Sequence, residues 1–320
     1  MPVQFARREF LTGMVAMTAA KAASHFVPPA ASSSPFRVSV INDEISQDFG
    51  HACEVASSEF GLGWIELRGM WNKNIVNLDE KEVAEARRIL EKYKLKVTDI
   101  ASPLFKVDWP GTPKSKFSEA KSFGASFSLE QQDEVLERAV EMAKSFQTER
   151  VRCFDFWRLE NQTPYRTAIN ERLRDAAAKA EKKGIILVLE NEPACNTATG
   201  AEAAKVLSAV QSSSFMLNWD PGNAAASGEI PYPDGYRLLP KNRIGHCHCK
   251  DVVKKGNKFE WAPMGGGIID WAGQFKALKR DGYHYAVSLE THWHGGGSPE
   301  ESSRRSWAGM KKILQQHDAL

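Results

Sequence analysis

The sequence has almost no net charge, so it lacks the electrostatic attraction that draws strongly charged partners to a protein. It contains 42 Lys and Arg residues against 40 Asp and Glu residues. The charged residues of the first 30 positions are Arg7, Arg8, Glu9 and Lys21, so the remainder carries 39 of each sign. A neutral chain has no overall attraction for nucleic acid or for an anionic membrane surface. We therefore expect no nucleic-acid partner.

Long hydrophobic runs and a disulfide framework are also missing. The Ala-rich stretch Leu11–Ala23 is interrupted by Gly13 and Lys21 and is shorter than the ~18–20 residues that a membrane-spanning helix needs. This excludes stable membrane insertion by that stretch. The five cysteines are odd in number, and their spacing fits no small disulfide scaffold. We expect mostly buried free thiols.

A pair of arginines precedes the Ala-rich stretch. Arg7 and Arg8 come before Leu11–Ala23, and a segment rich in proline and small residues follows, at Val27–Pro35. This order is typical of a twin-arginine export signal. It predicts a signal peptide and flexible segment over residues 1–35, a single catalytic domain over residues 36–320, and export to the periplasm. A disordered N-terminus with a chance arginine pair is the alternative.

Short β-rich runs alternate with amphipathic helical stretches through the rest of the chain. The runs are apolar, as strands buried on both faces should be: Arg37–Ile41, Trp64–Leu67, Val97–Ala101, Val151–Phe156, Ile185–Glu190, Phe215–Asp220, Ile244–Lys250 and Tyr285–Glu290. Helical patterns lie between them, for example Asp79–Tyr93, Ser128–Ser145, Tyr165–Lys183 and Ala201–Gln211. Eight repeats predict an α/β fold, a closed (β/α)8 TIM barrel. A doubly wound open sheet is the alternative, and no G-x-G-x-x-G follows the first run to support dinucleotide binding.

Polar side chains end four successive runs: Glu190, Asp220, His248 and Glu290. Strand side chains alternate between faces, so the adjacent His and Cys residues of the 246–249 run cannot all bind one zinc ion. The carboxyl ends of parallel strands meet at one end of a barrel. Three carboxylates and one imidazole suit a single divalent cation, which the sequence leaves open as Mn²⁺, Co²⁺, Mg²⁺ or Zn²⁺.

At these residues the chain resembles the sugar phosphate isomerase/epimerase family, the xylose isomerase-like TIM barrels. The resemblance covers about residues 37–316 and depends on the following motifs: Leu189-Glu190-Asn191, Trp219-Asp220, His246-Cys247-His248-Cys249-Lys250-Asp251, Gly265-Gly266-Gly267-Ile268-Ile269-Asp270-Trp271, Gly282-Tyr283 and Ser288-Leu289-Glu290-Thr291. It implies Glu190, Asp220, His248 and Glu290 as metal ligands. It also implies that the catalytic residues Glu190 and Glu290 handle protons on opposite sides of a bound sugar. Two positions depart from many members, Asn223 and Glu192, where the family often has histidine.

The predicted chemistry is proton abstraction next to a carbonyl, in which a divalent cation stabilises the enediolate. This is the chemistry of a sugar isomerase or epimerase acting on a small carbohydrate. Additional polar residues are candidates for substrate binding: Glu66, Arg68, Glu192, Asn223, Lys250 and His292. His246 lies one inward step deeper than His248, and we expect it to pack or hydrogen-bond inside the barrel.

Three alternatives use the same fold. A lyase acting on 3-keto-glycosides by β-elimination would share the metal and the carboxylates. A catalytically silent sugar-binding barrel is favoured by Asn223 and opposed by the presence of Glu190 and Glu290. A DNA-repair endonuclease is opposed by export, by the neutral charge and by too few ligands for three zinc ions. The sequence leaves open a homo-oligomer.

Overall fold

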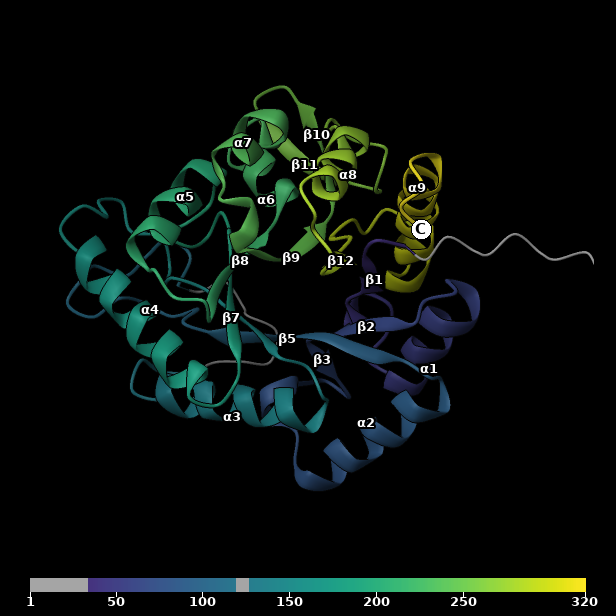
Figure 1. Cartoon of the computed structure of the whole chain (residues 1–320), viewed down its shortest axis with the longest axis horizontal. Coiled ribbons are helices and arrows are strands. Elements are labelled where there is room, and N and C mark those ends of the chain that lie inside the picture. The colour runs from purple at the N-terminus through teal and green to yellow at the C-terminus, as the bar shows by residue number, and fades with distance from the viewer. Residues whose placement is uncertain (1–33, 119–126) are drawn as a thin grey trace, which may run out of the picture. The chain divides into compact units, whose positions relative to one another are not determined.

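Eight parallel strands form one sheet in the computed structural model, which describes residues 34–118 and 127–320 (Figure 1). The strands are β1 (Arg37–Val40), β2 (Trp64–Leu67), β5 (Lys96–Leu104), β6 (Arg150–Cys153), β7 (Ile186–Glu190), β8 (Phe215–Trp219), β9 (Ile244–Cys249) and β12 (Ala286–Leu289). Their order in the sheet is β1-β12-β9-β8-β7-β6-β5-β2. A parallel bridge between Ile41 and Glu66 brings the two outer strands together, so the barrel is nearly closed. The predicted (β/α)8 TIM barrel is confirmed.

Helices alternate with these strands and surround the barrel (Figure 1). They are α1 (Phe49–Glu54), α2 (Glu80–Lys92), α3 (Gln132–Ser145), α4 (Arg166–Glu181), α5 (Gly200–Ala209), α6 (Pro221–Ala226), α7 (Tyr236–Leu238), α8 (Trp271–Arg280) and α9 (Pro299–Gln316). A side-chain cap marks the start of α1, α2, α5, α6, α8 and α9. At α2, Asp79 accepts a hydrogen bond from the Glu82 amide, and the Glu82 carboxylate accepts one from the Asp79 amide. This capping box satisfies amides that the first turn leaves free.

Short elements complete the described part of the chain. Two antiparallel pairs, β3 (Gly69–Met70) with β4 (Lys73–Asn74) and β10 (Asp251–Lys255) with β11 (Lys258–Ala262), lie outside the barrel sheet. Single helical turns span Asn42–Glu44, Val55–Glu59, Ile75–Asn77, Pro231–Gly235 and Lys241–Arg243. None of the helices within residues 34–118 and 127–320 has the length and apolar character to cross a bilayer.

Two predicted strands end three residues away from the observed strand ends, whereas the other predicted strand bounds agree with the structure to within one residue. The run predicted as Val97–Ala101 continues to Leu104 in β5, where the register with β6 shifts between Ile100 and Leu104. The run predicted as Val151–Phe156 ends at Cys153, and Phe156 takes a positive φ of 69° that a strand cannot hold. Both differences lie at carboxyl ends, where the loops that follow change the direction of the chain.

The cysteines are all described, and all five are buried free thiols, as the sequence predicts: Cys53, Cys153, Cys195, Cys247 and Cys249. The predicted signal is a different case. Arg7, Arg8 and the Ala-rich stretch lie outside the described residues, so the export signal and the boundary at residue 35 stay predictions.

Candidate metal centre

Four neighbouring strands bring the predicted ligands together at their carboxyl ends. Glu190 is the last residue of β7, Asp220 directly follows β8, His248 lies in β9, and Glu290 directly follows β12. Asp220 also caps α6, because its carboxylate accepts a hydrogen bond from the Asn223 amide at 2.8 Å. The Glu290 amide donates to the Cys249 carbonyl at 3.1 Å and continues the β12–β9 pairing by one residue. Strand register therefore sets where each ligand sits.

The four side chains converge on one point. His248 Nδ1 lies 3.3 Å from Glu190 Oε1, 3.7 Å from Asp220 Oδ2 and 3.2 Å from Glu290 Oε2. One ligand atom from each of the four residues lies within 4.8 Å of every other. All four side chains are at most 2% exposed. Glu190 Oε2 and Asp220 Oδ2 make no well-aligned hydrogen bond among the described residues, and each lies within ion-pair distance of a basic side chain. Buried oxygens of this kind, beside an imidazole nitrogen, fit a divalent cation.

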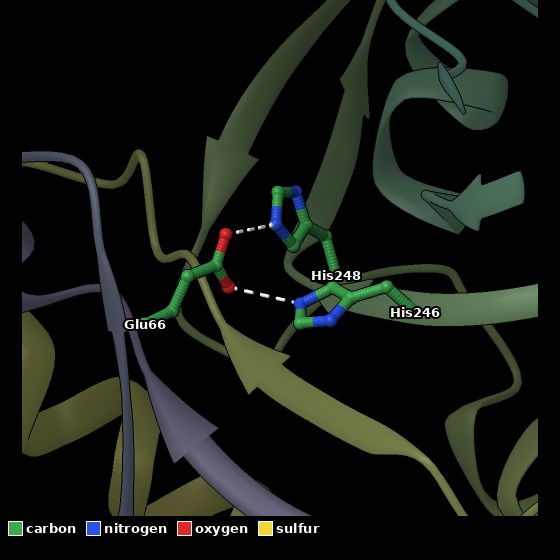
Figure 2. Close-up of side chains that lie close together, drawn as sticks. All are labelled: Glu66, His246 and His248. Carbon is green, nitrogen blue, oxygen red and sulfur yellow. Dashed lines mark hydrogen bonds and ion pairs between the residues drawn. The ribbon is translucent and has the colours of Figure 1, made fainter. Parts of the chain in front are cut away.

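A fourth carboxylate, that of Glu66, lies on the opposite side of the His248 ring. Figure 2 shows both histidine rings of β9 directed at Glu66 of β2. His248 Nε2 lies 3.0 Å from Glu66 Oε1, and His246 Nε2 lies 2.9 Å from Glu66 Oε2. All three side chains are fully buried. His246 thus hydrogen-bonds inside the barrel, and Glu66 contacts the histidines rather than the barrel opening.

Basic side chains compensate the buried carboxylates. Arg152 Nη1 lies 3.1 Å from Glu190 Oε2, and Arg68 Nη1 lies 2.7 Å from Glu290 Oε1. Lys250, which is fully buried, contacts Glu290 Oε2 and lies 2.8 Å from Asp220 Oδ2. Burial alone would favour the neutral form of each carboxyl group and so raise its pKa. At Glu190 and Glu290 the nearby positive charges have the larger effect. His248 and Arg152 lower the pKa of Glu190 to about 2, and Lys250, His292 and His248 hold the pKa of Glu290 well below its usual range.

The remaining predicted substrate residues lie around this centre. Asn223 donates hydrogen bonds to Glu190 Oε1 at 3.1 Å and to the Asn191 carbonyl at 2.9 Å, so it holds the Glu190 carboxylate. Glu192 pairs with Lys106 at 3.4 Å and contributes no atom to the four-ligand cluster. His292 Nε2 lies 3.3 Å from Glu290 Oε1, and its side chain is 30% exposed. Their roles toward a substrate stay predictions.

Three charged residues of this network were missed by the sequence reasoning. Asp43 and Glu44 follow β1 and bind the Arg68 guanidinium at 3.0 and 2.8 Å. Their position at the end of a barrel strand, like that of Glu190, is a signal that could have identified them. Arg152 lies inside β6, where the alternation of side chains along the strand could have predicted an inward orientation.

The match to a protein family decides what this barrel is. The family model described as "Xylose isomerase-like TIM barrel" matches residues 55–313. The chain belongs to this family. Among curated proteins, none matches the sequence.

Several solved structures of xylose isomerase-like barrels and related proteins share the fold. One is a probable 3-DHS dehydratase, AsbF from Bacillus anthracis, with 21% identity, a TM-score of 0.65, and coverage of 87% of this chain and 98% of that chain. Another is the IOLI protein with a bound zinc atom, with 16% identity, a TM-score of 0.66, and coverage of 89% and 100%. A third is a D-allulose 3-epimerase from Methylomonas sp. in complex with D-allulose, with 16% identity, a TM-score of 0.60, and coverage of 88% and 97%.

Proposed function

We propose that this family member is a divalent-metal-dependent sugar isomerase or epimerase that removes a proton next to a carbonyl. The observation that carries the proposal is the cluster of Glu190, Asp220, His248 and Glu290, whose ligand atoms lie within 4.8 Å of one another. These four residues would hold the cation. When bound, a divalent cation acts as a Lewis acid that stabilises the negative charge of an enediolate. A zinc-bound neighbour and an epimerase with its sugar support the proposal.

Glu190 and Glu290 are suited to move the protons. Because the pKa of each is lowered, both are ionised at neutral pH and so are free to accept a proton, although the same low pKa makes each a weak base in the metal-free chain. They come from β7 and from the end of β12, which are separated in the sheet by β8 and β9. Two carboxylates on different strands can address opposite faces of one carbon. Epimerisation needs this arrangement, since the proton leaves from one face and returns to the other.

The polar neighbours hold these two carboxylates in place. Asn223 and Arg152 bind different oxygens of Glu190, and Arg68 and Lys250 bind different oxygens of Glu290. A carboxylate fixed at both oxygens keeps one orientation toward a bound substrate. Arg68 and His292 are partly exposed and offer N–H donors to substrate hydroxyl groups.

A lyase acting on 3-keto-glycosides is a second candidate. It would use the same metal and carboxylates to form an enolate and then expel a leaving group. The fold shared with a probable dehydratase, whose reaction name denotes elimination of water, favours keeping this candidate.

Deuterium exchange distinguishes these functions. The metal-loaded chain is incubated in D₂O with free sugars, glycosides and 3-keto-glycosides, and products are followed by NMR and mass spectrometry. An isomerase or epimerase incorporates deuterium next to the carbonyl and forms an isomer of unchanged heavy-atom composition, whereas a lyase releases an aglycone.

The variant Glu290→Gln is the control, and we expect it to remain folded and to lose nearly all turnover because an amide cannot accept the proton. If Glu290→Gln kept full activity, the proton-handling role would be wrong. If no sugar exchanged deuterium or was cleaved, the silent sugar-binding barrel would become the better explanation.

A further inference from the structure

The Lys250 ammonium lies among the same oxygens that would bind the cation. Its Nζ is 2.8 Å from Asp220 Oδ2 and 4.0 Å from Glu190 Oε1, and it contacts Glu290 Oε2. These are also the three oxygens that face His248 Nδ1. The ammonium therefore does not bind at a separate position beside the cluster. Lys250 contacts the same three carboxylates that would bind the cation.

The chain has a built position for this lysine. The Lys250 side chain is fully buried, and its Nζ lies 5.3 Å from the centre of the Trp261 ring. A Cβ added at Gly222 would overlap Lys250 Cγ and would lie 3.1 Å from the Lys250 carbonyl. The absence of a side chain at Gly222 thus leaves the space that the lysine stem occupies. The next residue, Asp251, begins β10 and fixes the backbone.

Electrostatics makes the ammonium and a divalent cation rivals. Three carboxylates buried together require positive charge nearby, and Lys250 supplies it to Asp220 at 2.8 Å. A divalent cation at the same oxygens would supply that charge itself and would repel an ammonium held a few ångströms away. The three carboxylates therefore cannot bind the Lys250 ammonium and a divalent cation at full strength at the same time.

We propose that Lys250 competes with the divalent cation for Glu190, Asp220 and Glu290, so that metal binding requires the ammonium to withdraw. This inference rests on the metal-binding part of the proposed function. Lys250 then stabilises the metal-free chain and makes the metal affinity weaker than the four ligands alone would give. It also keeps the carboxylates assembled before the metal arrives.

The test compares Mn²⁺ and Zn²⁺ affinities of the full chain and its variants by calorimetric titration with the metal chloride. Lys250→Met removes both the charge and the hydrogen bonds, whereas Lys250→Gln removes the charge and keeps polar contacts that help the chain fold. We expect each variant to bind metal about tenfold more tightly than the wild type, or better. Without metal, each should unfold at a lower temperature than the wild type, and metal should raise that temperature more than it does for the wild type.

Lys106→Met is the matched control. It removes the same charge from a lysine that pairs with Glu192 and contacts no atom of the cluster. Its metal affinity should stay within about twofold of the wild type. If Lys250→Met folds only with metal, it is purified loaded, and its affinity is measured by competition with a chelator.

The outcomes separate this inference from the proposed function. If the wild type binds metal and both Lys250 variants bind it equally or more weakly, the competition is overturned while the metal site stands. If only the Lys250 variants bind metal, the competition is supported, whereas the metal-dependent function proposed for the wild type is overturned. If no form binds metal, both fail. An equal gain in Lys106→Met would show a general charge effect and would also overturn the competition.

Discussion

The His248 ring lies between Glu66, which faces Nε2, and the carboxylates of the metal centre, which face Nδ1. The contact that each ring nitrogen makes decides the role of that nitrogen. A neutral imidazole has one N–H group. If that group lies on Nε2 and donates to Glu66 at 3.0 Å, the lone pair of Nδ1 remains for a cation. Glu66 then acts on the metal centre only through His248. His246 acts one step further away, since it contacts the other oxygen of Glu66.

The order of contacts outward from the metal centre, from His248 to Glu66 to His246, predicts a graded loss of metal affinity in variants of these residues. We expect Glu66→Gln to weaken divalent-cation binding about 10- to 100-fold, because an amide cannot accept hydrogen bonds from both histidines. His248→Ala removes a ligand and should cost more, whereas His246→Ala should cost less than Glu66→Gln. Metal titration of the three variants measures the order. Equal losses in His246→Ala and His248→Ala would contradict it.

Asp99 of β5 is a buried carboxylate whose two oxygens have no hydrogen-bond partner among the described residues. Burial is the main cause that raises its pKa from 3.8 to about 6. Below about pH 4 the group is protonated in both folded and unfolded chains. Between pH 4 and 6 the unfolded chain loses the proton first, so the free energy of unfolding falls as the pH rises through this window.

Asp99→Asn should therefore stabilise the protein in a pH-dependent way. The difference between 3.8 and about 6 corresponds to at most about 3 kcal/mol above pH 6. We expect the variant to gain about 1–3 kcal/mol in free energy of unfolding at pH 7.5 and nothing near pH 4. Urea denaturation at the two pH values measures this. An equal gain at both would mean that the charge of Asp99 is not the cause.

At the scale of elements, the glycine-rich segment before α8 is fixed to the start of β10. The Asp251 carboxylate accepts hydrogen bonds from the amides of Gly265, Gly267 and Ile269 at 3.0–3.3 Å. A Cβ added at Gly267 would overlap the Asp251 carboxylate and the Val252 carbonyl. The motif therefore needs glycine because backbone and carboxylate approach each other closely there.

Gly267→Ala should loosen this connection. We expect it to lower the free energy of unfolding by about 1–3 kcal/mol and to increase amide hydrogen exchange over residues 263–270. Gly63→Ala is the control, because a Cβ there meets no atom within 4 Å and should be nearly neutral. Exchange mass spectrometry and chemical denaturation of both variants decide the matter. Unchanged exchange in Gly267→Ala would show that the segment adapts without cost.

The strands of the barrel could be predicted to within about one residue at most ends, because each is a short apolar run that alternates with a helical stretch in the sequence. The convergence of Glu190, Asp220, His248 and Glu290 also followed, since parallel strands end on one side. Contacts across the barrel could not be predicted in the same way. Glu66 and His246 are 180 residues apart, and their pairing depends on strand order and register, which local patterns do not contain.

At the scale of the whole molecule, the chain divides into a short N-terminal part, residues 1–32, and the barrel, residues 33–320. The polar network of the metal centre is contained entirely in the barrel. We propose that the N-terminal part serves export and that the barrel is complete without it. The arginine pair, the Ala-rich stretch and the segment rich in proline and small residues support a twin-arginine signal that delivers the protein to the periplasm.

Replacing Arg7 and Arg8 by lysine tests this proposal at the smallest chemical cost. Both residues keep their positive charge, so a nonspecific electrostatic role would be preserved, whereas recognition that needs the guanidinium groups would be lost. We expect the Lys-Lys form to stay in the cytoplasm and the wild type to reach the periplasm, measured by cell fractionation and immunoblotting. The substituted protein should unfold at the same temperature as the wild type, because the barrel is unchanged. Normal export of the Lys-Lys form would show that the arginine pair is not an export signal.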